Sequence, residues 1–170
     1  MFARYFIELP MDPEGVEAAL LRSPETWVPG LAREANHHGD ALLAEVGFGG
    51  DVRVARRVAI EFREPVRMPS KTVIPLHWAA VGASGLFPAL EADLEIAPLS
   101  PARTQLAMSA RYVPPLGVIG RAIDRAVLFR VAEATLKDFL DRLGATLTAQ
   151  SRGAESTQGY GGVPVGLDPA

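Results

Sequence analysis

A long amphipathic pattern near the end of the chain constrains the fold more than any other feature. It begins at Leu116, directly after the helix breaker Pro114-Pro115, and continues at near-helical spacing to Leu147. A helix of about 30 residues is about 45 Å long, whereas globular helices average about 11 to 12 residues. Such a helix needs an equally long apolar surface, which the strand-like segments before it can supply. Its apolar positions are Ile119, Ile123, Val127, Val131, Leu136, Leu140, Leu143 and Leu147.

Alternation of apolar and polar residues predicts a series of antiparallel strands before this helix. Gly49-Gly50-Asp51 predicts a hairpin turn, and Pro65–Ser70 predicts a second turn. Pro75 cannot donate a ladder hydrogen bond, so we expect it at an edge or a bulge. The expected strands are Phe2–Leu9, Ala41–Phe48, Val52–Arg63, Thr72–Ala80, Ala89–Ile96 and Thr104–Val113.

Two short helices are expected directly after the first strand. Asp12 is suited to be the N-cap of the first and Pro13 its first residue. A second covers Glu25–Trp27 and is ended by Pro29-Gly30, with loop or irregular helix from Leu31. The sequence thus predicts an α+β fold in which a curved antiparallel sheet of about six to seven strands wraps around a long C-terminal helix.

Composition excludes several classes of function. With a formal net charge of −3, the chain gives no electrostatic reason to expect nucleic acid. It has no cysteine, so disulfides and thiolate chemistry are excluded. No stretch approaches the roughly 18 apolar residues of a transmembrane helix, and Met1–Tyr5 does not resemble a signal peptide. We therefore expect a cytoplasmic protein with one domain over residues 1–148 and a disordered tail over 149–170, where Gly, Ser, Gln and Pro are frequent from Ser151 onward.

The order of the expected elements resembles the helix-grip fold of the SRPBCC (START / birch-pollen-allergen-like) superfamily, over roughly residues 2–147. The segment Arg111–Gly117, followed by Asp124-Arg125 and Val131–Leu140, is similar to the last strand and grip helix of bacterial polyketide cyclase/dehydrase and lipid-transport-like members. The resemblance implies an internal cavity. It does not imply a particular reaction, because the superfamily includes lipid carriers, cyclases and hydroxylase domains.

Few residues indicate catalysis or metal binding. His37 and His38 are adjacent, so on an extended chain they point in opposite directions, and we expect no metal site there. His77 is a candidate general base near a cavity mouth, although an exposed strand histidine is the simpler interpretation. No Gly-x-Ser-x-Gly nucleophile motif is present, and Gly47–Gly50 fits a hairpin better than a dinucleotide loop. The sequence implies no cofactor and identifies no catalytic residue.

Arg56 and Tyr112 are polar residues that fall in phase with the apolar positions of their strands. Inside a cavity they could bind a carboxylate or carbonyl of a ligand; otherwise Arg56 turns outward at a bulge or pairs with an acid. Leu86 and Phe87 in one loop, and the glycine-containing helix start, could form the cavity mouth. The expected ligand-binding residues are Arg56, Trp78, Leu86, Phe87, Met108, Tyr112, Ile119 and Ile123.

Three functions fit these features. The first is a module that binds or carries a hydrophobic small molecule, lipid- or polyketide-like. The second is a cyclase/dehydratase-type enzyme that acts on such a molecule through Arg56, His77 or Tyr112. The third is an interaction or chaperone-like module with an exposed apolar patch. Two converging titratable side chains in the cavity favour the enzyme, whereas an apolar lining with one polar anchor favours the carrier. Sequence leaves the oligomeric state open.

Overall fold

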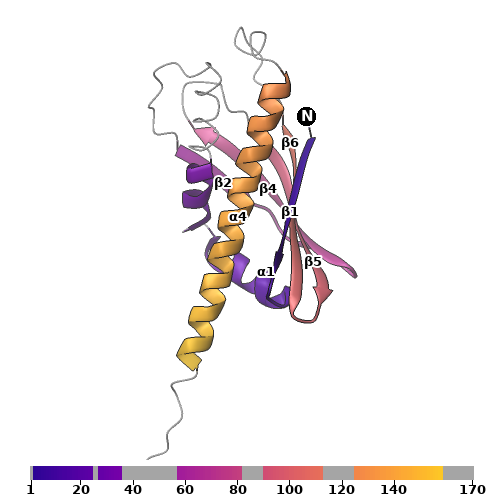
Figure 1. Ribbon diagram of the computed structural model, residues 1–170, viewed down its shortest axis with the longest axis vertical. Helices are drawn as coiled ribbons and strands as arrows, with labels where there is room; N and C mark the ends of the chain where they lie inside the picture. The colour runs from indigo at the N-terminus through magenta and orange to yellow at the C-terminus, as the bar shows by residue number, and fades with distance from the viewer. Residues whose placement is uncertain (1, 25–26, 36–56, 82–89, 113–124, 159–170) are drawn as a thin grey trace, which may run out of the picture.

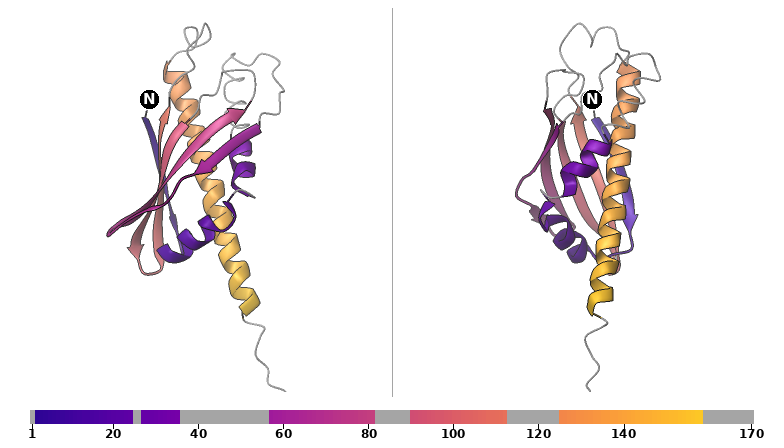
Figure 2. Two further views of the ribbon diagram at one scale, coloured as in Figure 1. Left: turned by 180° about the vertical axis from the view of Figure 1, so that it is seen from behind. Right: turned by 90° about the vertical axis from the view of Figure 1, so that its left-hand side faces the viewer.

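The computed structural model describes residues 2–24, 27–35, 57–81, 90–112 and 125–158. One antiparallel sheet curves around a long helix, and the short helices lie at the side of that helix (Figures 1 and 2). The strands run in the order β1-β6-β5-β4-β2, with β3 beside β4. The elements are β1 (Phe2–Leu9), α1 (Pro13–Leu21), β2 (Arg57–Phe62), β3 (Val66–Met68), β4 (Lys71–Val81), β5 (Leu90–Ser100), β6 (Arg103–Tyr112) and α4 (Arg125–Gln158).

The start of α1 is confirmed as predicted. The Asp12 carboxylate accepts a hydrogen bond of 2.7 Å from the backbone N–H of Gly15, and Pro13 is the first helical residue. This bond satisfies one of the N–H groups that a helix start leaves without an internal partner. Val16 and Leu20 are fully buried, so α1 turns one apolar side into the core.

The second short helix is longer than predicted. Residues 27–35 are helical, so Pro29-Gly30 does not end the helix at Trp27. Pro29 and Gly30 both lie inside this described helical stretch. Val28, Ala32 and Ala35 are fully buried, because their spacing of three to four residues places them on one side.

Pro75 lies where the outer neighbour of β4 changes. β3 pairs with β4 up to Val73, and β2 pairs with it from Leu76. The carbonyl of Pro75 accepts a hydrogen bond of 2.8 Å from the N–H of Arg63. The missing donor of Pro75 therefore falls at an interruption of the outer ladder. The expectation that Pro65–Ser70 is wholly a turn is wrong, because β3 occupies half of it and only Pro69 and Ser70 form the turn.

The core lies between α4 and the concave face of the sheet. Every second residue of β4, β5 and β6 points inward, as the alternation predicts. Burying each large apolar side chain contributes roughly 1.5–3 kcal/mol. The fully buried large side chains are Leu20, Ile74, Leu76, Trp78, Leu94, Ile96, Leu106, Met108, Phe139, Leu140, Leu143 and Leu147.

Gly144 allows α4 to lie close to β1. A Cβ at this position would collide with the side chain of Ile7 and would lie 3.1 Å from the Cδ2 of Leu9. The helix and the strand can therefore pack at this distance because the position has no side chain.

α4 extends further than the sequence predicted. It continues to Gln158, so the expectation of disorder from Ser151 is wrong for residues 151–158. Extending an existing helix needs no new nucleus, and Ala149, Gln150 and Arg152 are good helix formers. The predicted strand over 41–48 and the predicted helix start at Leu116 lie outside the described residues. Within the described part of the chain, no helix combines the length and the apolar character needed to cross a membrane.

Candidate functional site

Two threonines are the buried polar residues of the described interior. Thr104 is fully buried at the start of β6, and Thr135 is 6% exposed on α4. All other fully buried side chains in this part of the chain are apolar. A hydroxyl in such surroundings needs a hydrogen-bond partner, because leaving it unpaired costs about 1–3 kcal/mol.

Thr104 has its partner. Its hydroxyl donates a hydrogen bond of 2.8 Å to the backbone carbonyl of Met11, which lies between β1 and α1. The bond ties the start of β6 to the connection that leads into the first helix. The hydrogen-bonding capacity of the Thr104 hydroxyl is therefore satisfied within the fold.

Thr135 has none. Its Oγ1 is buried and makes no hydrogen bond with any residue that the structure describes. Thr146 and Thr148, further along α4, donate to the carbonyls of Arg142 and Gly144 at 2.9 and 2.8 Å, the usual back-bond to the preceding turn. Thr135 thus differs from these two threonines of the same helix.

An aromatic pair lies one helical turn along α4 from Thr135. The rings of Trp78 and Phe139 meet edge to face, with centroids 4.9 Å apart and planes at 66°. Phe139 is one helical turn after Thr135, so the two share one flank of α4. Nearer the start of the helix, Phe129 is partly buried and packs against the same core.

The structure places three of the predicted ligand-binding residues. Trp78 and Met108 point into the interior from β4 and β6, where both are buried. Tyr112 is the last residue of β6, opposite Leu90. The other five predicted residues lie outside the described part of the chain: Arg56, Leu86, Phe87, Ile119 and Ile123.

His77 is on the wrong face for the role of a cavity base. Its neighbours Leu76 and Trp78 point inward, so its ring lies on the outer face, where its Nδ1 is 2.8 Å from a carboxylate oxygen of Glu91. The simpler interpretation, a strand histidine off the apolar face, is therefore confirmed, and the candidate role as a cavity base is not. His37 and His38 lie outside the described residues. Among the residues that the structure does describe, no group of three or more side chains could hold a metal ion.

Sequence reasoning missed Thr135. Its spacing from Phe139 could have placed it near the apolar side of the helix. The lack of a partner, however, depends on side-chain orientation and on the neighbouring strands, which the sequence does not show.

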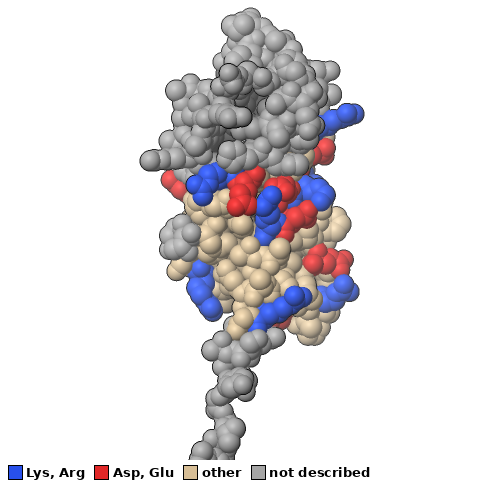
Figure 3. Space-filling view, turned by 60° about the vertical axis from the view of Figure 1, so that its left-hand side comes forward, with Lys and Arg blue, Asp and Glu red and all other residues tan. Residues whose placement is uncertain are grey.

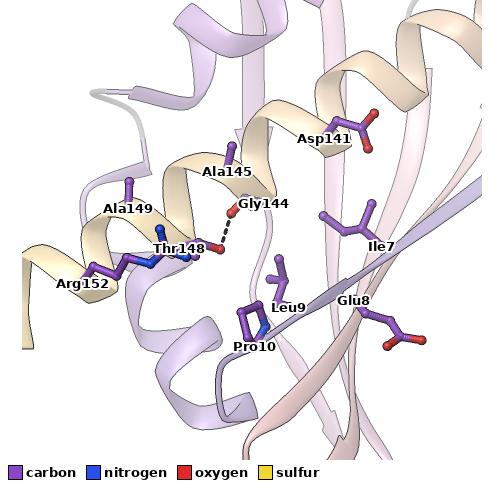
Figure 4. Close-up of a pocket in the computed structure, with 10 residues that line it drawn as sticks. All are labelled: Ile7, Glu8, Leu9, Pro10, Asp141, Gly144, Ala145, Thr148, Ala149 and Arg152. Atoms are coloured by element: carbon purple, nitrogen blue, oxygen red, sulfur yellow. Dashed lines mark hydrogen bonds between the residues drawn. The ribbon is translucent and has the colours of Figure 1, made fainter.

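Two surface grooves are lined by α4 and β1 together. One, of about 420 Å³, lies beside Ile7, Glu8 and Gly144 and is drawn in Figure 4, which also shows the Thr148 bond to the Gly144 carbonyl. The other, of about 360 Å³, lies nearer the start of β1 beside Tyr5 and Lys137. The hydrogen bond from Lys137 to Asp141, 2.6 Å long, and its proximity to Tyr5 raise the pKa of the Lys137 ammonium.

The surface around α4 carries mixed charge. Arg142 pairs with Asp138 at 2.7 Å and with Glu34, which raises the pKa of the Arg142 guanidinium. Lys137 pairs with Asp141 rather than with the Glu133 one turn earlier. Figure 3 shows basic and acidic side chains side by side across this view. The described part of this surface therefore has no extended patch of a single sign.

Solved structures share this fold. No family model matches the chain, and a search of curated proteins found no match. The Zhui aromatase/cyclase from Streptomyces sp. R1128 is 13% identical, with a TM-score of 0.50 over 96% of this chain and 99% of that one. A conserved protein from Geobacillus kaustophilus is 17% identical over 89% and 97%, with a TM-score of 0.49. Ara h 8.0201 is 9% identical over 88% and 99%, with a TM-score of 0.43. The element order and the first of these likenesses confirm the helix-grip fold.

Proposed function

We propose that this protein binds a hydrophobic small molecule, lipid- or polyketide-like, between α4 and the concave face of the sheet, and that the Thr135 hydroxyl bonds a polar group of that molecule. The observation that carries the proposal is the unpartnered, buried Oγ1 of Thr135 among apolar side chains. We expect the protein to do this in the cytoplasm.

The physical argument rests on what the hydroxyl costs and what a ligand supplies. Without a partner, Thr135 destabilises the empty protein by about 1–3 kcal/mol. A carbonyl or hydroxyl oxygen of a ligand would accept its hydrogen bond, so the cost is removed only in the complex. The apolar body of the same molecule would lie against aromatic and aliphatic side chains such as Phe139 and Trp78.

The described interior favours binding over catalysis. A cyclase or dehydratase needs a positioned acid or base, and general acid–base catalysis requires a titratable group within reach of the substrate. None of the described buried side chains titrates, and His77 lies on the outer face. An apolar lining with one polar anchor is the pattern expected of a carrier. The enzyme alternative would depend on Arg56 and on the Tyr112 side chain, and mutation of these two residues tests it.

The experiment measures binding of a fluorescent fatty acid and of a flavonoid to the purified protein. We expect saturable binding with one site per chain. Thr135→Val keeps the shape of the side chain and removes the hydroxyl, so it should weaken the probe that uses this bond by about 2- to 10-fold. Thr135→Ser should retain most of the affinity.

Thr104→Val is the matched control. Its hydroxyl already bonds the Met11 carbonyl, so the substitution should lower stability and leave the affinity of the folded protein unchanged. If neither probe binds, or if Thr104→Val and Thr135→Val weaken binding equally, the proposed site is wrong.

A further inference from the structure

We infer that two copies of this chain associate through the free edge of β1, antiparallel, around a two-fold axis that passes beside Phe6. Among the strands that the structure describes, β1 is the end strand of the sheet and pairs only with β6, from Phe2 opposite Arg111 to Leu9 opposite Thr104. Its other edge offers a row of backbone N–H and C=O groups, and the strand can be followed along its whole length beside α4 in Figure 1.

The free edge carries large apolar side chains. The outer face of β1 presents Phe2 and Phe6, which are 58% and 55% exposed. Edge strands of monomeric proteins are commonly protected by proline, by charged side chains, especially lysine, or by a bulge. β1 contains no proline, lysine or bulge, and its two charged residues, Arg4 and Glu8, have opposite signs. Exposed phenylalanines at an unpaired sheet edge are typical of a surface that another strand covers.

The charges of β1 are complementary to those of a second copy in one register. Arg4 and Glu8 flank Phe6 at equal distances on the outer face. When Phe6 lies opposite Phe6 of a second copy, Arg4 of each chain lies opposite Glu8 of the other. Opposite charges and aromatic pairs placed directly across from each other stabilise an antiparallel pair of strands.

Neighbouring registers lose this match. Centring the axis on Tyr5 places Arg4 opposite Phe6, and centring it on Ile7 places Glu8 opposite Phe6. An axis placed between two adjacent residues of β1 would set outward-pointing residues opposite inward-pointing ones. The register centred on Phe6 therefore pairs both charges.

The inner face fits the same register. Tyr5 and Ile7 are only partly buried, and each would lie opposite the other residue in the second copy. Aromatic and β-branched residues form favourable cross-strand pairs. The pairing would therefore cover apolar surface that the single chain leaves partly open.

The two grooves beside β1 add charge complementarity. The groove at the Arg4 end is also lined by Arg130, Lys137 and Glu133, so it is mainly basic. The groove at the Glu8 end is lined by Asp141 and Arg152 as well, so it holds more acid. The two-fold axis would set the basic groove of one copy towards the acidic groove of the other.

The existing ion pairs leave these residues available. Arg4 contacts Glu95 at 3.3 Å, and Glu8 contacts Arg103 at 3.1 Å. The side chains of Arg4 and Glu8 are 52% and 47% exposed, and ion pairs of this kind are weak. The self-matching pattern identifies the occupant as a second copy rather than an unrelated strand.

The first experiment measures self-association by sedimentation equilibrium over a wide range of protein concentration. We expect a reversible dimer that Phe6→Glu weakens by about tenfold or more, because it places two carboxylates at the axis. The control is Leu99→Glu, at a 49% exposed position on β5, which should leave the dimer unchanged. A monomer at every concentration, or a dimer that Phe6→Glu does not weaken, overturns the inference.

The second experiment tests the register itself. Arg4→Glu alone and Glu8→Arg alone should each weaken the homodimer, because each sets like charges opposite one another. An equimolar mixture of the two variants should form a heterodimer with affinity close to the unaltered protein, since both charge pairs are then restored. If the mixture associates no better than either variant alone, the register is wrong.

A third experiment uses the absence of cysteine from the chain. Opposite Cα atoms of an antiparallel pair are about 4.5–5.5 Å apart, within the range that a disulfide spans. Phe6→Cys should therefore form a covalent dimer on mild oxidation, and Leu99→Cys should not. Equal crosslinking of both variants overturns the proposed contact. The inference is also overturned if the pure chain stays monomeric and β1 instead binds an unrelated protein.

Discussion

The two buried threonines mark two regions of the interior that use polarity differently. Around Thr104, α1 is fixed to the sheet by the bond to Met11 and by Glu17, which accepts hydrogen bonds of 2.9 Å from Thr72 and Arg67. Around Thr135 there is no such bond, although the side chain is almost as well buried. The same residue type thus stabilises the fold in one region and leaves a bonding capacity unused in the other.

This difference indicates that the two regions of the interior have different roles, one structural and one in ligand binding. Hydrogen bonds that are satisfied within the chain make a region rigid and specific. A buried group without a partner lowers stability, and proteins tolerate such costs mainly where function requires them. The region of Thr104 would therefore hold the architecture, and the region of Thr135 would receive a ligand.

Phe139→Ala is expected to have the largest effect. The ring is fully buried and packs edge to face on Trp78, beside Thr135. Removing it should lower the free energy of unfolding by about 3–5 kcal/mol through lost burial and the cavity left behind. Urea unfolding measures this. The control Phe2→Ala, at a 58% exposed position, should change the unfolding free energy of the monomer by less than about 0.5 kcal/mol. Equal effects of the two substitutions would contradict the described core.

Thr104→Val should lower stability by about 1–3 kcal/mol. The substitution leaves the Met11 carbonyl without its buried donor while keeping the volume of the side chain. For a domain of this size the midpoint of thermal unfolding should fall by roughly 2–4 °C for each kcal/mol. An unchanged midpoint would show that the Thr104–Met11 hydrogen bond does not stabilise the fold, and the contrast with the region of Thr135 would then be lost.

Gly144→Ala should cost roughly 1–3 kcal/mol despite the higher helix propensity of alanine. The added methyl would collide with Ile7, so α4 and β1 must move apart. Gly153→Ala is the matched control in the same helix, because a Cβ there meets nothing within 4 Å. It should stabilise by about 0.5–1 kcal/mol. If both substitutions stabilise the protein, α4 does not lie as close to β1 as described.

Much of the architecture could be predicted from local patterns. Phe2–Leu9 alternates and became β1 with the predicted bounds, and Asp12-Pro13 carries the signals that start α1. Errors occurred where a local signal was overridden. Pro29-Gly30 lies inside a helix whose apolar side is buried, and α4 passes Ser151 because helix formers continue it. Such outcomes depend on packing and on helix extension, which a breaker or a flexible composition does not reveal.

The candidate site was harder to predict for a related reason. Thr135, Thr146 and Thr148 look alike in the sequence, yet two donate to the preceding turn and one does not. Partnership is a property of side-chain orientation in the folded protein. The predicted site residues Trp78 and Met108 point into the interior, but sequence could not tell core from lining.

Thr135→Val should have the smallest effect, and its sign is informative. Valine has the shape of threonine without the hydroxyl, so the substitution removes a buried group that bonds nothing. We expect the empty protein to become more stable, by up to about 1 kcal/mol, because the desolvation cost is lost and no hydrogen bond is broken. Thermal unfolding of ligand-free protein, beside Thr104→Val, measures the contrast. Opposite signs at the two positions are the expected result. A loss of stability at both would mean that Thr135 makes a hydrogen bond in solution, and its hydroxyl would then not be available to a ligand.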